Sequence, residues 1–350
     1  MKPVRVAAIG LGWVTLHRHI PALLRNPAFR LAGVIDPHPG RAEQTAQKLG
    51  LAHFAETDDL AKVEWFNDVD AVTIGAPPMI HAALAVNALA QGKHVLTEKP
   101  FAMTVAEGEA MADAARAGSR VLAVVHNFQF SRAARKLAND LARGRLGNIR
   151  RIAAVQLGNP KRRLPDWYEQ LPLGLFYDES PHFFYLLRGL AGGMLHLQHA
   201  HGVADSAGAN TPRFVSMLYM SANALPVTID CQFDSALSEW YVLVTGERAL
   251  GILDIFRDIY LRLPNDGAHT LPQVLRTSVS ALIQHAAQHV PNGLAYLRGR
   301  LDYGNDEVFA RFARAIYDGA SPNGIGIDDA LAVLKLQHEA TAAIERNMFR

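Results

Sequence analysis

The chain has 350 residues, 49% hydrophobic and 19% charged, and its 35 Lys and Arg against 33 Asp and Glu leave a formal net charge of +2. The length predicts two domains, the apolar content excludes a disordered chain, and the near-neutral charge excludes a dedicated nucleic-acid binder, which needs many phosphate contacts. The single cysteine excludes an intrachain disulfide and a multi-cysteine metal site. The chain has no apolar run near 18 residues, and a glycine interrupts its first apolar segment early, so we predict neither a membrane-spanning helix nor a secretory signal. We therefore expect a cytoplasmic protein without a membrane partner.

The first third of the chain alternates short apolar runs with helical patterns. The runs predict strands at 4–9, 31–36, 69–74, 93–96 and 120–125, with helices between them that end near 25 and cover 41–49, 80–91 and 105–117. Such alternation is typical of a parallel sheet with helices on both faces, which binds its ligand beyond the carboxyl ends of the strands. We therefore predict that residues 1–122 form an α/β dinucleotide-binding domain with a doubly wound Rossmann sheet.

The pattern changes after about residue 150. Consecutive strands are predicted at 150–157, 195–202, 213–220, 226–234, 239–245, 249–255 and 258–263, followed by helices over about 271–298, 305–318 and 327–345. A run of strands and then of helices indicates an α+β domain with an open, mainly antiparallel sheet, which we assign to residues 123–350 as the substrate-binding and oligomerisation domain. Because its strands are apolar on one face and polar on the other, we expect a homodimer or homotetramer.

A glycine pair opens the first predicted helix. Gly10 and Gly12 follow the first strand directly, and the helix begins at Trp13 and Val14. The first glycine permits a tight turn, the second lets the backbone approach a pyrophosphate, and the helix start supplies N–H groups. Thr15 stands where a third glycine is usual, which predicts a slightly looser approach of the helix to the sheet.

The end of the second strand bears on the choice of cofactor. Asp36 lies there, where its carboxylate is placed to hydrogen-bond a ribose diol. A carboxylate at this point repels a 2′-phosphate, so we expect NAD as the cofactor. NADP stays open, because Arg41 is close in sequence and His38 can be protonated.

Two further motifs follow the next strands. One is Gly75-Ala76-Pro77-Pro78-Met79-Ile80-His81, and the other is Thr97-Glu98-Lys99-Pro100. A lysine at the carboxyl end of a parallel strand lies at the mouth of the ligand cleft, where its ammonium can bond a substrate hydroxyl, and Pro100 stiffens the turn that carries it. The alternative is a solvated lysine in a surface turn.

Asp178 and His182 are four residues apart at the start of an apolar helical pattern, so they lie on one face of a helix. A carboxylate beside an imidazole fixes the tautomer of the ring and raises its basicity, which suits a group that takes a proton while hydride leaves. The alternative is a helix-capping aspartate and a packed histidine. Glu179 and Tyr177 are nearby candidates for substrate contact.

These motifs, with His126-Asn127-Phe128 and the closing helical pattern 326–344, resemble the glucose–fructose oxidoreductase and inositol dehydrogenase family (Gfo/Idh/MocA). The resemblance implies an NAD(P)-dependent oxidoreductase that moves hydride between nicotinamide and a hydroxyl or ketone carbon of a sugar, polyol or nucleotide-sugar derivative. It implies His182 as general acid/base, Asp178 as its orienting acid and Lys99 as a catalytic residue beside the substrate oxygen, with a cis Lys99–Pro100 bond. The cofactor contacts that it implies are Gly10, Gly12, Trp13, Val14, Asp36, Ala76, Pro77, His81, Glu98, Lys99 and Asn127. Ser180 and Gln129 depart from the family pattern, which usually has glycine and often arginine there.

The remaining charged clusters allow more than one interpretation. The segment from Arg132 to Arg163 contains ten basic residues and one acidic residue, Asp140. Such a run indicates either a solvated surface or a contact with an anionic substrate. The histidines at 196, 199, 201, 285 and 289 lack suitably spaced carboxylates, so no metal site is predicted. Two other functions stay open: a non-catalytic dinucleotide-binding regulator or scaffold, and a lyase or glycosidase that uses NAD transiently.

Overall fold

The computed structural model describes residues 2–299, 301 and 303–349, and its contacts divide the chain into two compact units. The first unit holds the chain up to Asn127 and the later segment Asn305–Lys335, and the second holds Phe128–Gly304 and the chain from Leu336. This division differs from the predicted single boundary after residue 122. That boundary falls inside strand β6 (Leu122–Val124), which belongs to the first sheet because it pairs with β5.

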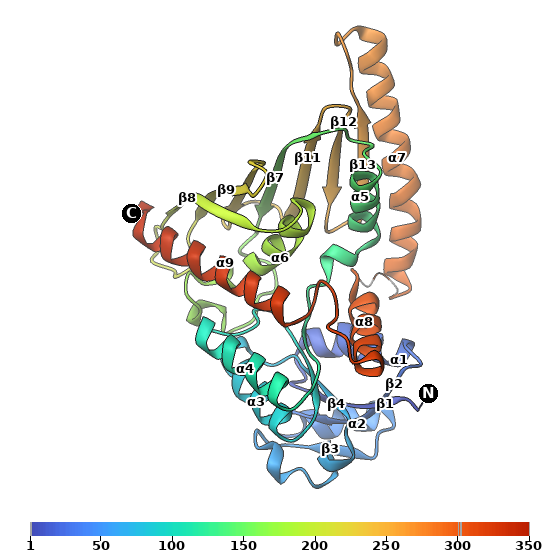
Figure 1. The fold of residues 1–350 in the computed structure, drawn as a ribbon, viewed down its shortest axis with the longest axis vertical. Helices are drawn as coiled ribbons and strands as arrows, with labels where there is room; N and C mark the ends of the chain where they lie inside the picture. The colour runs from blue at the N-terminus through green and yellow to red at the C-terminus, as the bar shows by residue number, and fades with distance from the viewer. Residues whose placement is uncertain (1, 300, 302, 350) are drawn as a thin grey trace. The chain divides into compact units, whose positions relative to one another are not determined.

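The first unit is built on a parallel sheet of six strands in the order β3-β2-β1-β4-β5-β6 (Figure 1). The strands are β1 (Val4–Ile9), β2 (Phe29–Ile35), β3 (His53–Ala55), β4 (Ala71–Ile74), β5 (His94–Thr97) and β6. The helices are η1 (Thr15–His19), α1 (Ile20–Arg25), α2 (Arg41–Leu49), η2 (Leu60–Lys62), η3 (Glu64–Asp68), η4 (Pro78–Ile80), α3 (His81–Ala90), α4 (Val105–Ala117), α8 (Asn305–Asp318) and the start of α9 (Ile327–Arg346). This arrangement confirms the predicted doubly wound sheet, whose strand order reverses between β1 and β4.

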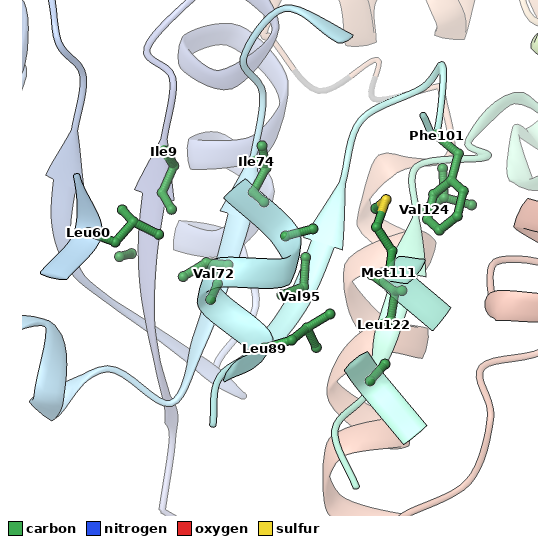
Figure 2. Close-up of a cluster of buried hydrophobic side chains, with 14 of the residues drawn as sticks. Ile9, Leu60, Val72, Ile74, Leu89, Val95, Phe101, Met111, Leu122 and Val124 are labelled. Carbon is green, nitrogen blue, oxygen red and sulfur yellow. The ribbon is translucent and has the colours of Figure 1, made fainter. Parts of the chain in front are cut away.

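Buried aliphatic side chains fill the space between this sheet and its helices. Figure 2 shows Ile9, Val72, Val95 and Val124 from the strands β1, β4, β5 and β6, with Met111 of α4. The strands are apolar at consecutive positions because helices cover both faces of a doubly wound sheet. This packing fixes the strands, and with them the loops that leave their carboxyl ends.

The segment Asn305–Lys335 completes the first unit. Phe309 and Phe312 of α8 pack on Phe29 of β2, with ring centroids 6.1 and 6.2 Å away. The N–H of Val124 in β6 donates to the carbonyl of Ile325 at 2.9 Å, so the edge of the sheet is also covered by this segment. The sequence predicts α8 as a helix but places it in the second domain, because an apolar stripe does not specify which sheet it covers.

The second unit contains an eight-stranded sheet in the order β13-β12-β11-β7-β10-β9-β8-β14. Its strands are β7 (Ile149–Leu157), β8 (Leu195–Val203), β9 (Phe214–Ser221), β10 (Pro226–Gln232), β11 (Glu239–Gly246), β12 (Ala249–Asp254), β13 (Ile259–Pro264) and β14 (Met348–Phe349). Its helices are η5 (Phe128–Phe130), α5 (Arg132–Ala142), η6 (Tyr168–Gln170), α6 (Leu175–Leu190), α7 (Leu271–Leu297) and the end of α9. Only the pairs β7–β10 and β8–β14 are parallel among the described strands of this sheet, which confirms the predicted open, mainly antiparallel sheet.

Helix α6 covers one face of the second sheet. Phe184 contacts Tyr219 of β9 at 6.0 Å, and Phe183 contacts Trp240 of β11 at 5.1 Å between ring centroids. All four side chains are buried. Residues on this face alternate with half-exposed ones along each strand, as an antiparallel sheet with one covered face requires.

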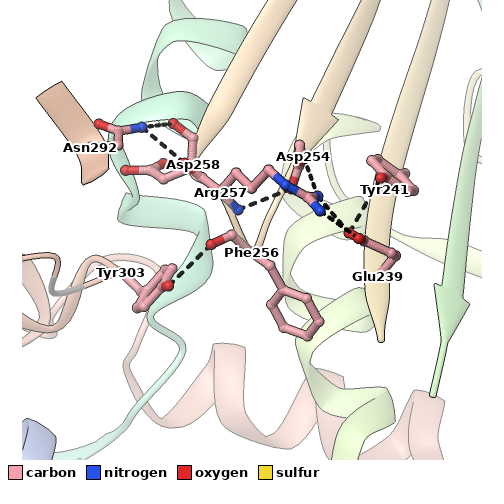
Figure 3. Close-up of polar contacts among 8 residues, drawn as sticks. All are labelled: Glu239, Tyr241, Asp254, Phe256, Arg257, Asp258, Asn292 and Tyr303. Atoms are coloured by element: carbon pink, nitrogen blue, oxygen red, sulfur yellow. Dashed lines mark hydrogen bonds and ion pairs between the residues drawn. The ribbon is translucent and has the colours of Figure 1, made fainter. Parts of the chain in front are cut away.

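A polar network fixes the turn between β12 and β13 (Figure 3). Arg257 forms a bidentate ion pair with Glu239 at 2.5 and 2.6 Å and a further ion pair with Asp254 at 2.8 Å. The Asp258 carboxylate accepts from the first N–H groups of α5 at 2.8 and 3.3 Å, which caps that helix. Asn292 of α7 donates to the carbonyls of Arg257 and Asp258 at 2.9 and 2.7 Å. The turn thus binds α5 and α7 to the edge of the sheet.

His94 makes the stability of the first unit depend on pH. Its Nδ1 accepts a hydrogen bond from the Val121 N–H at 2.9 Å, and burial with repulsion from Arg120 lowers its pKa to about 4. The unfolded chain, with a histidine pKa of about 6.5, therefore binds the proton more readily, and stability falls as the pH drops from about 6.5 to 4. We expect His94→Gln to remove part of this dependence, well under about 3 kcal/mol because solvent screens the half-buried ring, measured by urea unfolding across that range.

The exposed His196 supplies the control for that measurement. His196→Gln is expected to leave the pH dependence of unfolding unchanged, because this side chain is solvated on β8. An unaltered slope in the His94→Gln variant would contradict the assignment.

Candidate functional site

The predicted cofactor residues of the first unit lie at the carboxyl ends of its strands. Gly10 follows β1, Asp36 follows β2, Ala76 lies two residues after β4, Glu98 follows β5, and Asn127 lies three residues after β6. The structure therefore brings these positions to one edge of the sheet. Ligands of doubly wound sheets bind at this edge, where the strand order reverses.

The two glycines of the first loop have different roles. Gly10 has φ +77°, and a Cβ there would lie 2.7 Å from the Ala76 nitrogen, so the loops after β1 and β4 approach closely only with glycine. At Gly12 a Cβ would meet only the Gly75 oxygen within 4 Å, at 3.8 Å, so this backbone is open. Residues 13–25 form a continuous helix whose first N–H groups have no acceptor within the helix. The open loop and the helix start fit a pyrophosphate.

Gly75 makes room for Thr15 in the position of the third glycine. A Cβ on Gly75 would lie 2.1 Å from Thr15 Oγ1. The glycine just after β4 therefore leaves room for the Thr15 hydroxyl. Thr15 is fully buried and begins the π-helical turn η1. Glycine at position 75, instead of at position 15, thus lets the helix pack against the end of β4.

Asp36 braces the glycine loop. Its Oδ2 accepts from the Leu11 N–H at 2.7 Å and lies 3.4 Å from Arg41 Nη1, and its Oδ1 lies 2.9 Å from both the N–H and the ring Nδ1 of His38. Burial raises the pKa of this carboxyl, but these hydrogen bonds outweigh burial, and the pKa lies below its usual value. A carboxylate has about four acceptor positions, so a ribose hydroxyl must displace a side chain here. The exposed rings and guanidinium of His38 and Arg41 are the groups that can move.

Glu98 is anchored by residues that lie outside the predicted motifs. Its Oε1 lies 2.8 Å from His19 Nε2, and His19 Nδ1 lies 2.8 Å from Thr73 Oγ1. Its Oε2 accepts from the backbone N–H of Lys99 at 3.0 Å. Burial raises the pKa of Glu98, but its interactions with His19 and Lys99 outweigh burial, so the pKa lies below its usual value. The carboxylate thus fixes the start of the turn that carries Lys99.

A signal for this chain of polar groups exists in the sequence. Thr15 and His19 are one turn apart on the helix face that also buries Ile20 and Leu23. A histidine in an apolar stripe requires a buried partner, because an unpaired buried imidazole is costly. The stripe indicates a partner for His19, although it does not identify Glu98.

His81 bridges the two loops at this edge. Its Nδ1 lies 2.8 Å from the Pro100 oxygen and its Nε2 lies 2.8 Å from the Ala76 oxygen. Burial lowers the pKa of the ring in spite of these two acceptors. The ring is fully buried, so it positions the loops through the carbonyls of Ala76 and Pro100 instead of offering a polar atom to a cofactor. The Lys99–Pro100 bond is cis, as the resemblance implies, and Lys99 itself is partly exposed.

Trp13 and Val14 stand at the beginning of the helix after the glycine loop. Trp13 is exposed and stacks on His17 with ring centroids 4.9 Å apart, while the guanidinium of Arg18 lies 5.2 Å from the centre of the indole. Val14 is half-buried. The stacked rings place an aromatic face and a positive charge beside the loop, which suits an anionic, partly aromatic ligand.

His182 in the second unit is held in an aromatic surrounding. Its ring centroid lies 4.6 Å from that of Phe128 and 5.4 Å from that of Trp240, and its Nδ1 lies 2.7 Å from the hydroxyl of Tyr185. The Phe128 N–H donates to the same hydroxyl oxygen at 3.0 Å. The Tyr185 hydroxyl therefore ties the imidazole of His182 to the backbone of η5 and fixes its orientation. Of residues 173–187, only His182 is partly exposed.

Asp178 lies one turn before His182 on α6 and is buried. Pro181 interrupts the hydrogen bonding of this helix because it has no N–H for the carbonyl of Tyr177. Gln337 of α9 compensates by donating to that carbonyl at 2.5 Å. A proline is therefore tolerated inside the helix that carries the predicted pair.

Several residues that the sequence offers for substrate contact have structural partners. The Glu179 carboxylate pairs with Arg162 at 2.5 Å and accepts from Gln156. Arg145 pairs with Asp140 at 2.9 Å, so part of the basic run is neutralised within the second unit. These pairs favour a structural role for this part of the run. Among the described residues, no group of three His, Cys, Asp or Glu side chains is arranged to hold a metal ion.

Comparison with known proteins supplies relatives for part of the chain. The chain is 34% identical over 152 residues to scyllo-inositol 2-dehydrogenase (NADP(+)) of Bacillus subtilis, and this alignment covers 43% of the chain and 44% of that protein. It is 32% identical over 162 residues to dTDP-3,4-didehydro-2,6-dideoxy-alpha-D-glucose 3-reductase of Actinomadura kijaniata, covering 46% and 47%. The chain thus aligns with less than half the length of these curated relatives.

Solved structures share the fold over nearly the whole chain. A 3-ketoreductase from Actinomadura kijaniata, solved with NADP and TDP-benzene, has a TM-score of 0.74 and 20% identity over 99% of this chain and 98% of that one. Levoglucosan dehydrogenase, solved with NADH, has a TM-score of 0.77 and 18% identity over the same shares. Residues 4–126 match the family model GFO_IDH_MocA, described as an oxidoreductase family with an NAD-binding Rossmann fold. These residues carry the glycine loop, Asp36 and the Glu98-Lys99-Pro100 turn, so the part of the chain that matches the model of this oxidoreductase family is the part whose motifs predict the resemblance.

Proposed function

We propose that this protein is an NAD(P)-dependent oxidoreductase that moves hydride between nicotinamide and a hydroxyl or ketone carbon of a sugar, polyol or nucleotide-sugar derivative. The observation that carries the proposal is the placement of Lys99, through Glu98 and His19, at the sheet edge that holds the glycine loop. Relatives named as an inositol dehydrogenase and a dTDP-sugar reductase support this substrate class. Nicotinamide, when bound, supplies the hydride acceptor or donor.

The proposal gives each residue a separate task. The Lys99 ammonium binds the substrate oxygen and stabilises the negative charge that develops there. His182 takes the hydroxyl proton in the oxidative direction and returns it in the reductive direction. Tyr185 orients the ring of His182, a role that the sequence analysis assigns to Asp178, and Asp178 is retained as a second orienting group on the same helix.

Turnover on a panel of sugars, polyols and nucleotide-sugars, followed by the absorbance of reduced nicotinamide with NAD and with NADP, tests this function. Turnover of at least one member is expected. Cofactor binding without turnover of any member would instead indicate a regulator or scaffold. Product without net change in reduced nicotinamide would indicate a lyase or glycosidase.

The surroundings of Asp36 support a specific prediction for cofactor choice. His38 and Arg41 are the exposed basic groups at the ribose end of the site, and both contact the Asp36 carboxylate. Replacing both by alanine is expected to weaken NADP binding about tenfold, because a 2′-phosphate loses its positive partners, and to leave NAD binding within about threefold. Calorimetry with each nucleotide measures the two effects. Arg30→Ala, which removes an exposed charge at the other end of β2, is the control, and equal losses for both nucleotides would contradict the prediction.

The second sheet supports the proposal of a homo-oligomer. On the face opposite α6, the residues Ala153, Leu243, Ile252 and Leu261 are paired in register across four neighbouring strands, and all are half-exposed. An apolar row of this kind on an open sheet suits contact with the same face of a second copy. A monomer in sedimentation equilibrium would refute this part of the proposal.

A further inference from the structure

Helix α7 has its polar side toward the protein. Gln284 accepts from the Arg262 N–H at 2.9 Å and donates to the Arg262 carbonyl at 3.0 Å. Gln288 makes the same pair of bonds with Tyr260, at 3.2 and 2.7 Å. Four residues of helix advance about 6 Å and two residues of strand about 6.7 Å, so successive side-chain amides meet alternate residues of β13. The glutamine side chains of α7 thereby pair with backbone N–H and carbonyl groups of the edge strand β13, as a neighbouring strand would.

The outward side of α7 is apolar. Leu271, Leu275, Val279, Val290, Leu294 and Leu297 are each between 47% and 81% exposed. The helix has 27 residues and a single formal charge, at Arg276. In Figure 1 it runs along the outer side of β13 in the second unit, with no other element of that unit on its far side. Such an exposed apolar surface marks an interaction site.

The exposed aliphatic residues of α7 lie at nearly the same distances on either side of the middle of the helix. If two copies of α7 lie antiparallel about a twofold axis between residues 284 and 285, Leu275 faces Leu294 and Val279 faces Val290, while Leu271 lies opposite the last turn, which carries Leu297. A twofold contact is made by the same patch on both copies, so it requires this kind of self-complementarity.

The centre of the helix fits the same arrangement. Leu282 and Ile283, 70% and 62% exposed, face Ala287 and Ala286 of the second copy in this register. Large side chains thus meet small ones where two helices come closest, as close packing requires. The two Arg276 side chains lie roughly 25 Å apart along the helix axis, so they do not repel each other strongly.

Area and charge favour a second copy over a lipid surface. Eight exposed aliphatic side chains supply on the order of 800 Å² per copy, which is one partner's share of a standard interface. Helices that lie on membranes carry many Lys and Arg on their polar side, whereas the polar side of α7 is uncharged and bound to β13. No helix in the described part of the chain, α7 included, is long and apolar enough to cross a membrane.

We propose that α7 is a contact surface between two copies of this chain, which pair antiparallel through its outward apolar side. This surface lies at the β13 edge and is distinct from the apolar row on the open sheet face. Two different twofold contacts on one chain generate a tetramer of dihedral symmetry. The proposal does not depend on the enzymatic activity.

Charge substitutions on the full chain test the proposal by sedimentation equilibrium. Val279→Glu with Val290→Glu places like charges opposite each other, and the mass is expected to fall by half. Val279→Glu with Val290→Lys pairs opposite charges in the antiparallel register and is expected to restore the native mass. The matched control is Leu237→Glu with Met194→Glu, two exposed apolar residues of the same unit outside α7, which should leave the mass unchanged.

A mass unaffected by the Glu/Glu variant would overturn the proposal, and failure of the Glu/Lys variant to restore the mass would overturn the antiparallel register. A mixture of Leu275→Cys and Leu294→Cys chains should form disulfides between the two variants and not within either, since Cys231 is buried. Wild-type binding to phosphatidylcholine–phosphatidylglycerol vesicles that the Glu/Glu variant loses, with its mass unchanged, would assign the helix to a membrane surface instead.

Discussion

Replacement of Lys99 by methionine is expected to lower kcat by about 10²–10³-fold, the usual cost of losing one group that stabilises a developing oxyanion. Methionine keeps an unbranched apolar stem, and the backbone hydrogen bond of residue 99 to Glu98 does not involve the side chain. The turn is therefore expected to keep its shape, and NAD(P) affinity measured by calorimetry should change by less than about threefold.

Lys48→Met is the matched control for this experiment, because Lys48 is an exposed lysine on α2 of the same unit. It should retain both turnover and cofactor binding. Full turnover in the Lys99→Met variant would remove Lys99 from the mechanism, whereas loss of cofactor binding would give it a role in binding only.

Replacement of His182 by glutamine is expected to lower kcat by about 10²–10⁴-fold, the range for loss of a general acid/base. The native kcat should depend on pH through the ionisation of its general acid/base, and this inflection should be absent from the variant. Because His182 is partly exposed, the variant is expected to fold normally. His196→Gln is the control, and retention of the inflection in the His182→Gln variant would contradict the assignment.

Tyr185→Phe separates positioning from proton transfer. The phenol bonds both the ring of His182 and the N–H of Phe128, and both bonds are lost in this variant. We expect about a tenfold fall in kcat and a displaced pH inflection, with little change in KM. A purely structural role would lower stability and leave the pH profile of kcat unchanged.

Local patterns predict most elements of this fold. The helices α2, α4 and α8 have the predicted bounds, and Thr104 with Glu107 forms the capping box that begins α4. Strand β3 (His53–Ala55) is missed because three partly exposed residues have no periodicity to detect. The sequence does not predict that α8 belongs to the first unit. Phe309 and Phe312 can pack against any apolar surface, and only the folded chain shows that they pack against Phe29.

The candidate site could be predicted where backbone chemistry dictates the residue. Gly10 and Gly12 are required by a close approach and an open loop, so their spacing is visible in the sequence. The distant partners of Asp36 and Glu98 could not be found in this way. Only the folded chain brings them close, since Leu11 is 25 positions from Asp36 and His19 is 79 positions from Glu98.

The return of residues 305–335 to the first unit has a consequence for biosynthesis. A nascent chain that has emerged only as far as the second sheet leaves Phe29 without Phe309 and Phe312, and β6 without its bond to Ile325. The six strands of the Rossmann sheet are therefore synthesised long before the segment that covers Phe29 and bonds β6. A cell that makes this protein must protect the early half from aggregation for almost the whole period of translation.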